Sequence, residues 1–138
     1  MELEKKIIIW TDELSTGILW QDLQHMEFLS MTNQVFDSFY ENKGKIDFDK
    51  TIFELEWYAK HHFAIEDKYM EVLEFDGIKG HRDQHDAFWG FIDDIRNASS
   101  RNVLEAGRVC NKLNNWFVEH IKIIDKKLGR FLQVKSQI

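Results

Sequence analysis

The chain has 138 residues, of which 43% are hydrophobic and 14% aromatic, enough for one domain with a substantial core. Its formal net charge of −6 argues against general nucleic-acid binding, which requires a basic face. The longest apolar run, residues 7–10, is too short for a signal-peptide core or a membrane span. Cys110 is the single cysteine, so no internal disulfide forms, and we expect a cytoplasmic location.

Residues 1–17 show no sustained helical period. We expect them to form an N-terminal arm that packs Ile7, Ile9 and Trp10 over the rest of the protein. The sequence contains no proline, which favours long uninterrupted helices over a turn-rich β fold.

Beyond the arm, apolar residues recur at helical spacing in four stretches, about 18–40, 47–75, 78–97 and 102–128. Local signals mark their ends: Asp47 is expected to cap the second stretch, Gly77 to close it in the left-handed conformation, and Gly129 to end the fourth. Short connections imply antiparallel neighbours. The sequence therefore predicts an all-α fold, an antiparallel up-down-up-down four-helix bundle with an N-terminal arm, as one domain over 1–138.

Seven groups able to bind a metal fall on or beside the apolar faces of these helices. Two pairs, His62 with Glu66 and His81 with His85, are four residues apart, which places both members of a pair on one helix face. A glutamate in the middle of such a face is costly unless something binds it, and buried imidazoles need partners for both nitrogens. We therefore predict a metal site formed by His25, His62, Glu66, His81, His85, His120 and Asp125.

The spacing of the last two groups is unusual. Asp125 follows His120 by five residues, which is about 140° round an ideal α-helix. Either Asp125 reaches across from the edge of the apolar face, or the helix widens locally into a π-type turn.

Seven ligands exceed the four of a structural zinc site, which argues for two metals. Imidazole combined with carboxylate suits iron, copper, zinc or nickel. If both metals are six-coordinate and are bridged by two carboxylates and one oxygen, a single position remains for a small ligand.

These motifs, in this order, resemble a hemerythrin of the single-domain bacterial type over nearly the whole chain. The residues that carry the resemblance are Trp10, Gly17-Ile18, Asp22-Leu23-Gln24-His25, His62-Phe63 with Glu66 and Met70, His81 with His85 and Phe88, and Trp116 followed by His120-Ile121 and Asp125. The resemblance implies a non-haem di-iron site, two iron ions with a bridging oxo or hydroxo group, that binds O2 reversibly.

By position in the family motifs, one iron would take its three histidines from the second half of the chain, His81, His85 and His120. The other would take His25 and His62 and hold the O2 position. The carboxylates Glu66 and Asp125 would bridge the two irons.

We expect an apolar pocket over the ligand position, because apolar walls exclude water and protons. Its nominated residues are Phe28, Phe63, Trp116, Phe117 and Ile121. Phe117 departs from the family, in which leucine often follows this tryptophan, and the larger ring is expected to narrow the pocket or its entrance.

The sixth histidine, His61, is expected on the flank of the bundle. Asp22 and Gln24 either contact the metal ligands or shape the start of the first helix.

The resemblance leaves four functions open. The leading one is binding of O2, or another small diatomic, for carriage, storage or delivery. The alternatives are an enzyme that reduces O2, peroxide or nitric oxide, a sensor of O2, redox state or iron that acts through a partner, and metal handling. No nucleic-acid or membrane partner is expected, and the protein partner is unknown.

Overall fold

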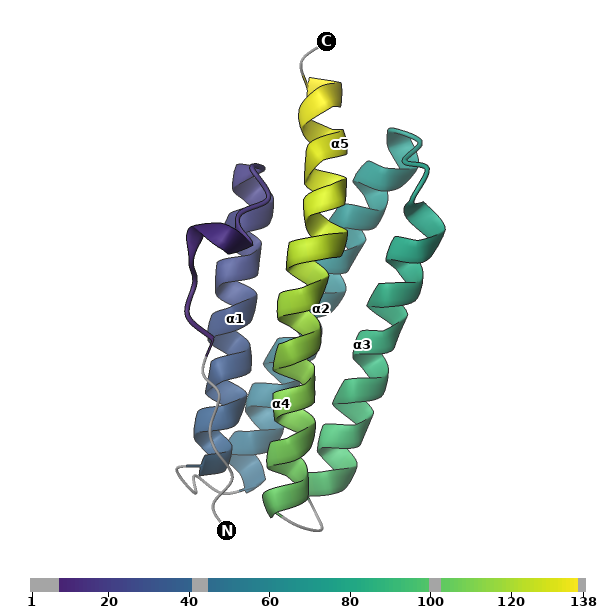
Figure 1. The fold of residues 1–138 in the computed structure, drawn as a ribbon. Coiled ribbons are helices and arrows are strands. Elements are labelled where there is room, and N and C mark those ends of the chain that lie inside the picture. Colours follow the sequence, from purple (N-terminus) through teal and green to yellow (C-terminus); the bar gives the residue numbers. More distant parts are fainter. Residues whose placement is uncertain (1–7, 41–44, 100–102, 137–138) are drawn as a thin grey trace.

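The fold is a bundle of antiparallel helices, shown by a computed structural model that describes residues 8–40, 45–99 and 103–136. Figure 1 shows the helices side by side, with the last continuing beyond the others. Their bounds are η1 (Asp12–Leu14, a 3-10 turn in the arm), α1 (Leu19–Tyr40), α2 (Lys45–Val72), α3 (Ile78–Ser99), α4 (Val103–Glu119), the π-helix η2 (His120–Asp125) and α5 (Lys126–Ser136). The described ranges contain no strand, so the predicted all-α four-helix bundle is confirmed.

Contacts join α1 to α2, α2 to α3, α3 to α4 and α4 back to α1, which closes the bundle around one interior. The apolar faces fill this interior in two clusters. One cluster surrounds Phe28, Phe88 and Phe117, and the other is built from Met70 and Leu128 with their neighbours. Along α2 and along α4–α5, the histidines and carboxylates fall between residues of the two clusters. None of the helices in the described part of the chain is long and apolar enough to cross a membrane.

The arm packs differently from the expectation. Ile9 is 77% exposed, which contradicts its predicted packing, whereas Ile8 and Trp10 are partly buried against the first cluster and Leu14 is buried. Alternation along an extended arm turns neighbouring side chains to opposite sides, so Ile8 and Ile9 cannot both face the bundle. Ile7 lies outside the described residues.

Gly129 does not end the last helix, as the sequence predicted, because α5 runs through it to Ser136. Gly129 is buried, and a Cβ atom there would lie 2.6 Å from the Thr16 carbonyl oxygen. Its lack of a side chain therefore serves close packing of the arm on α5 and not helix termination. This contact places the end of the arm against α5.

Helix α2 also begins and ends differently from the expectation. It begins at Lys45, so Asp47 lies inside its first turn and does not cap it. At the other end the left-handed residue is Glu74, with a φ of 56°, and not Gly77. The Phe75 amide donates to the Met70 carbonyl at 2.9 Å, and the Glu74 amide donates to the Glu71 carbonyl at 3.3 Å. This pair of bonds is the Schellman motif, which closes the helix before Gly77 is reached.

Candidate metal centre

All seven predicted groups are buried and gather in the interior of the bundle. They come from α1, α2, α3 and the π-helix η2, so the site depends on the packing of every helix pair around it. The ligand atoms form two overlapping sets that share both carboxylates. One set holds His81, His85 and His120, and the other holds His25 and His62.

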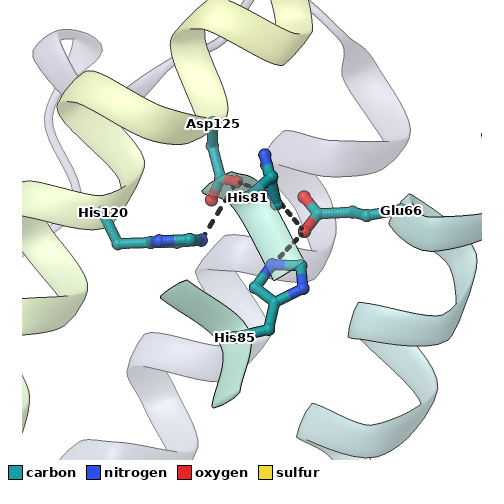
Figure 2. A group of neighbouring side chains, drawn as sticks. All are labelled: Glu66, His81, His85, His120 and Asp125. Atoms are coloured by element: carbon teal, nitrogen blue, oxygen red, sulfur yellow. Dashed lines mark hydrogen bonds and ion pairs between the residues drawn. The ribbon is translucent and has the colours of Figure 1, made fainter. Parts of the chain in front are cut away.

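The three-histidine half lies against one oxygen of each carboxylate (Figure 2). Glu66 Oε1 is 3.1 Å from His85 Nε2 and 3.4 Å from His81 Nε2. Asp125 Oδ1 is 3.2 Å from the Nε2 atoms of both His81 and His120. Three imidazoles and two carboxylate oxygens thus converge on one small volume.

The two-histidine half lies against the other oxygen of each carboxylate. Glu66 Oε2 is 3.4 Å from His62 Nε2 and 3.8 Å from His25 Nε2. Asp125 Oδ2 is 2.9 Å from His25 Nε2. Each carboxylate therefore turns one oxygen toward each half, and the two halves differ by one histidine.

The π-helix explains how Asp125 reaches this position. Residues His120–Asp125 form η2, in which one turn takes more residues than in an α-helix. The wider turn brings a residue five positions on back to the same face, so His120 and Asp125 both point inward. Of the two alternatives left open by the sequence, the local π-type turn is the one the structure adopts.

The donor set fits a metal ion, because several buried polar atoms lack the hydrogen bonds that burial normally demands. Among the described residues, the Nε2 atoms of His25, His85 and His120 and both Asp125 oxygens have no hydrogen-bond partner. They nevertheless point at one another across short distances. A cation at each convergence point would satisfy nitrogen and oxygen lone pairs together, and imidazole with carboxylate suits iron, zinc or copper.

The electrostatics of the metal-free chain favour ionised carboxylates. Burial and the Asp125 charge raise the pKa of Glu66, but the nearby His62, His81 and His85 outweigh them and hold it below its usual range. Burial likewise raises the pKa of Asp125, and its contacts with His120 and His25 more than reverse the effect. Both groups therefore carry the charge that a metal ligand needs.

The histidines divide by their surroundings. Burial lowers the pKa of His62 to about 4, with Glu66 only partly compensating. Burial also lowers the pKa of His81, but the nearby carboxylates of Asp125 and Glu66 raise it overall to about 9. In the metal-free chain His62 is neutral at neutral pH, whereas His81 holds a proton that a metal would displace.

The model of the hemerythrin HHE cation binding domain matches residues 16–132, a span that contains all seven groups. The chain belongs to the hemerythrin family. Its hemerythrin domain is similar to the bacteriohemerythrin of Ralstonia nicotianae, with 25% identity over 127 residues, 91% of this chain and 89% of that protein. It is 27% identical to the bacteriohemerythrin of Pseudomonas aeruginosa strain LESB58 over 115 residues, 83% of this chain and 74% of that protein. The bacteriohemerythrin of Clostridium acetobutylicum is 26% identical over 133 residues, 88% of this chain and 98% of that protein.

Two glutamines of α1 support the hemerythrin site. Gln24 accepts a hydrogen bond from His62 Nδ1 at 2.7 Å, which fixes the ring so that Nε2 faces inward. Gln21 donates to Glu66 Oε2 at 2.6 Å. Sequence reasoning nominated Gln24 and missed Gln21, although its position four residues before His25 places it on the same face. Asp22 instead accepts from the Thr16 amide at 2.8 Å and so anchors the arm.

Aromatic rings surround the hemerythrin site on both halves. Phe117 meets the His25 ring edge-on at 6.0 Å and stacks on Phe28 at 4.2 Å. Phe28 also meets the His62 ring edge-on at 6.1 Å. These two phenylalanines wall the two-histidine half.

The other nominated pocket residues lie elsewhere around the site. Phe63 stacks on His85 at 3.9 Å and is 5.8 Å from the His62 ring, so it spans the halves. Trp116 stacks on His120 at 4.8 Å and thus covers the three-histidine half. Ile121 is fully buried in the first cluster.

His61 lies outside the site, on the flank where the sequence placed it. Its Nδ1 is 2.7 Å from the Trp57 carbonyl, and its ring lies over Trp57 at 4.0 Å. Both residues are exposed, so this pair belongs to the surface of the bundle.

Proposed function

We propose that this hemerythrin-family chain binds O2 reversibly at a non-haem di-iron centre held by the seven buried groups. One observation carries the proposal: two carboxylates each face both halves, and one half has one histidine fewer than the other. Two irons bridged by Glu66, Asp125 and an oxo or hydroxo group would leave one coordination position. That position would lie in the two-histidine half.

The centre, when bound, would supply the electrons that reduce O2 and take them back on release. The protein contributes fixed geometry and a water-poor environment. Glu66 and Asp125, ionised and buried, would hold the metals and offset part of their charge. Gln24 holds His62 in the orientation that presents Nε2 to the metal.

The phenylalanines beside the two-histidine half give the proposed ligand position an apolar wall. Phe28 is fully buried, and Phe117 closes the space between it and His25. Such a wall disfavours the entry of water and protons, which would displace the ligand and leave the irons oxidised. This environment supports reversible binding more than turnover.

We also propose a cytoplasmic location, on the basis of the single reduced and buried Cys110.

A metal assay combined with absorption spectroscopy tests the proposal. The protein is reduced without air, recorded, exposed to O2 and then purged with inert gas. We expect two irons per chain and a visible band that appears with O2 and reverses on purging. Irreversible conversion to the oxidised form would point instead to a redox enzyme or sensor, and a chain without iron would contradict the proposed centre.

A further inference from the structure

Gln21 is a buried amide in the two-histidine half of the site. It lies on α1 one turn before His25 and has no exposed surface. Its Nε2 atom donates to Glu66 Oε2 at 2.6 Å. The same oxygen is the one that faces His62 and His25, at 3.4 and 3.8 Å. The amide is therefore bonded to the carboxylate oxygen that would bind the metal of the two-histidine half.

The orientation of this amide follows from chemistry. Glu66 Oε2 accepts the hydrogen bond from Nε2, so the NH2 group of the amide faces the carboxylate. The carbonyl Oε1 then points elsewhere, and it is buried without a hydrogen-bond partner among the described residues. A buried acceptor left unpaired destabilises the folded protein unless something binds it. The NH2 group also keeps a second hydrogen that Glu66 Oε2 does not take.

The three-histidine half has different surroundings. There Glu66 Oε1 faces His81 and His85, and the surrounding rings are those of Phe63 and Trp116. Gln24, the other glutamine at the site, already uses its carbonyl oxygen to accept a hydrogen bond from His62 Nδ1. This nitrogen lies across the imidazole ring from Nε2. Gln21 thus keeps unused hydrogen-bonding capacity, beside the half with fewer histidines.

We propose that Gln21 is a specificity-determining residue for the small ligand bound in the two-histidine half. This inference rests on the proposed di-iron function and refines it. Glu66 positions the amide, whose free N–H donates to an anionic ligand and whose Oε1 accepts from a protonated one. The site therefore favours small anions and protonated oxygen species over diatomics that form no hydrogen bond.

Azide, a small anion that accepts hydrogen bonds, is the probe. We would titrate it into the oxidised, iron-loaded protein and follow the visible absorption for the wild type, Gln21→Met and Gln34→Met. Methionine matches glutamine in length and removes both hydrogen-bonding groups. Gln34 is exposed on the same helix and lines the groove beside the arm, so it is a matched control.

Gln21→Met should weaken azide binding by roughly tenfold, the effect of losing one hydrogen bond to a charged group, and Gln34→Met should not change it. Unchanged azide affinity in a Gln21→Met protein with two irons would overturn the inference and leave the proposed function intact. A wild type without two irons would overturn both.

If Gln21→Met loses iron, the wild-type protein provides the test instead. The vibrational stretching band of azide bound to its iron is recorded in H2O and in D2O. A hydrogen-bonded azide shifts its band on this exchange, and an unshifted band would overturn the inference.

Discussion

His120 and Asp125 are five residues apart, yet His120 Nε2 lies 3.2 Å from Asp125 Oδ1. The π-helix η2 makes this possible, because its wider turn returns the fifth residue to the face of the first. Without it, an α-helix continuing from α4 would turn Asp125 away from the bundle interior. A local widening of one helix thus completes the carboxylate pair that both halves of the site share.

Replacement of Glu66 should therefore remove metal from both halves. Glu66→Ala deletes the oxygen near His85 and the oxygen near His62 together, so we expect fewer than two metals per chain by elemental analysis. Glu71→Ala, an exposed glutamate on the same helix, should retain the wild-type content. A Glu66→Ala protein that keeps two irons would contradict the proposed ligand set.

Phe117→Leu should loosen the wall of the two-histidine half. The smaller side chain removes the ring that stacks on Phe28 and meets His25 edge-on. We expect faster O2 release and faster autoxidation in spectroscopic assays, with a stability loss on the order of 1 kcal/mol from the cavity. Phe131→Leu, in the second cluster, should lower stability without changing either rate. Unchanged rates in Phe117→Leu would mean that this ring does not control the pocket.

The helices and the site residues could be predicted because both depend on spacing within one helix. Apolar periodicity identifies the inward face, and a charged or imidazole group on that face needs a compensating partner. His62 with Glu66, and His81 with His85, therefore indicated the site before the structure was known. The five-residue gap to Asp125 left two alternatives, since no local signal distinguishes a π-turn from a side chain that reaches across.

What the sequence did not predict depends on contacts between distant segments. Gly129 was expected to end a helix, but its partner is Thr16, more than a hundred residues earlier. Glu74 takes the left-handed position because Phe75, the next residue, packs with Met70 in the second cluster. Gln21 was missed because its importance comes from Glu66, on another helix.

Glu74→Gly should stabilise the protein. Glu74 pays a steric cost for its φ of 56° that glycine does not, and the Schellman hydrogen bonds need only the backbone. We expect a gain of about 1 kcal/mol in the free energy of unfolding, measured by thermal denaturation at fixed metal content. The same substitution three residues earlier, Glu71→Gly, should instead cost about 1 kcal/mol, because it lies inside the helix. Equal effects at both positions would contradict the motif.

Cys110 should be inert in the folded protein. Burial raises the pKa of its thiol to about 12, so at pH 8 its thiolate fraction is roughly 10⁻⁴, against about a quarter for an unfolded cysteine. Alkylation of the native protein by iodoacetamide should be about 10³-fold slower than alkylation of the protein unfolded in urea. The native rate should keep rising with pH above 9, whereas the rate for the unfolded protein levels off there. Rapid labelling of the native protein at pH 8 would contradict the burial of this thiol.

Gly129→Ala should detach the arm from α5. The added Cβ would lie 2.6 Å from the Thr16 carbonyl oxygen and 2.9 Å from the Thr16 Cβ, so the backbone of one segment must move. Overpacking of this kind costs about 1–3 kcal/mol, which a shift in the denaturation midpoint would report. The arm itself should become more accessible to protease near Thr16, since it would lose its contact with α5.

Gly90→Ala is the same chemical change as Gly129→Ala but should stabilise the protein. Gly90 lies in α3 with no atom within 4 Å of its added Cβ among the described residues. Alanine there reduces the entropy lost on folding and should stabilise the protein by about 0.5–1 kcal/mol. If both alanine variants stabilised it, Gly129 would be an ordinary helical glycine, and the close approach of Thr16 would carry no energetic weight. Opposite signs would show that the arm, and not helix termination, requires a glycine at position 129.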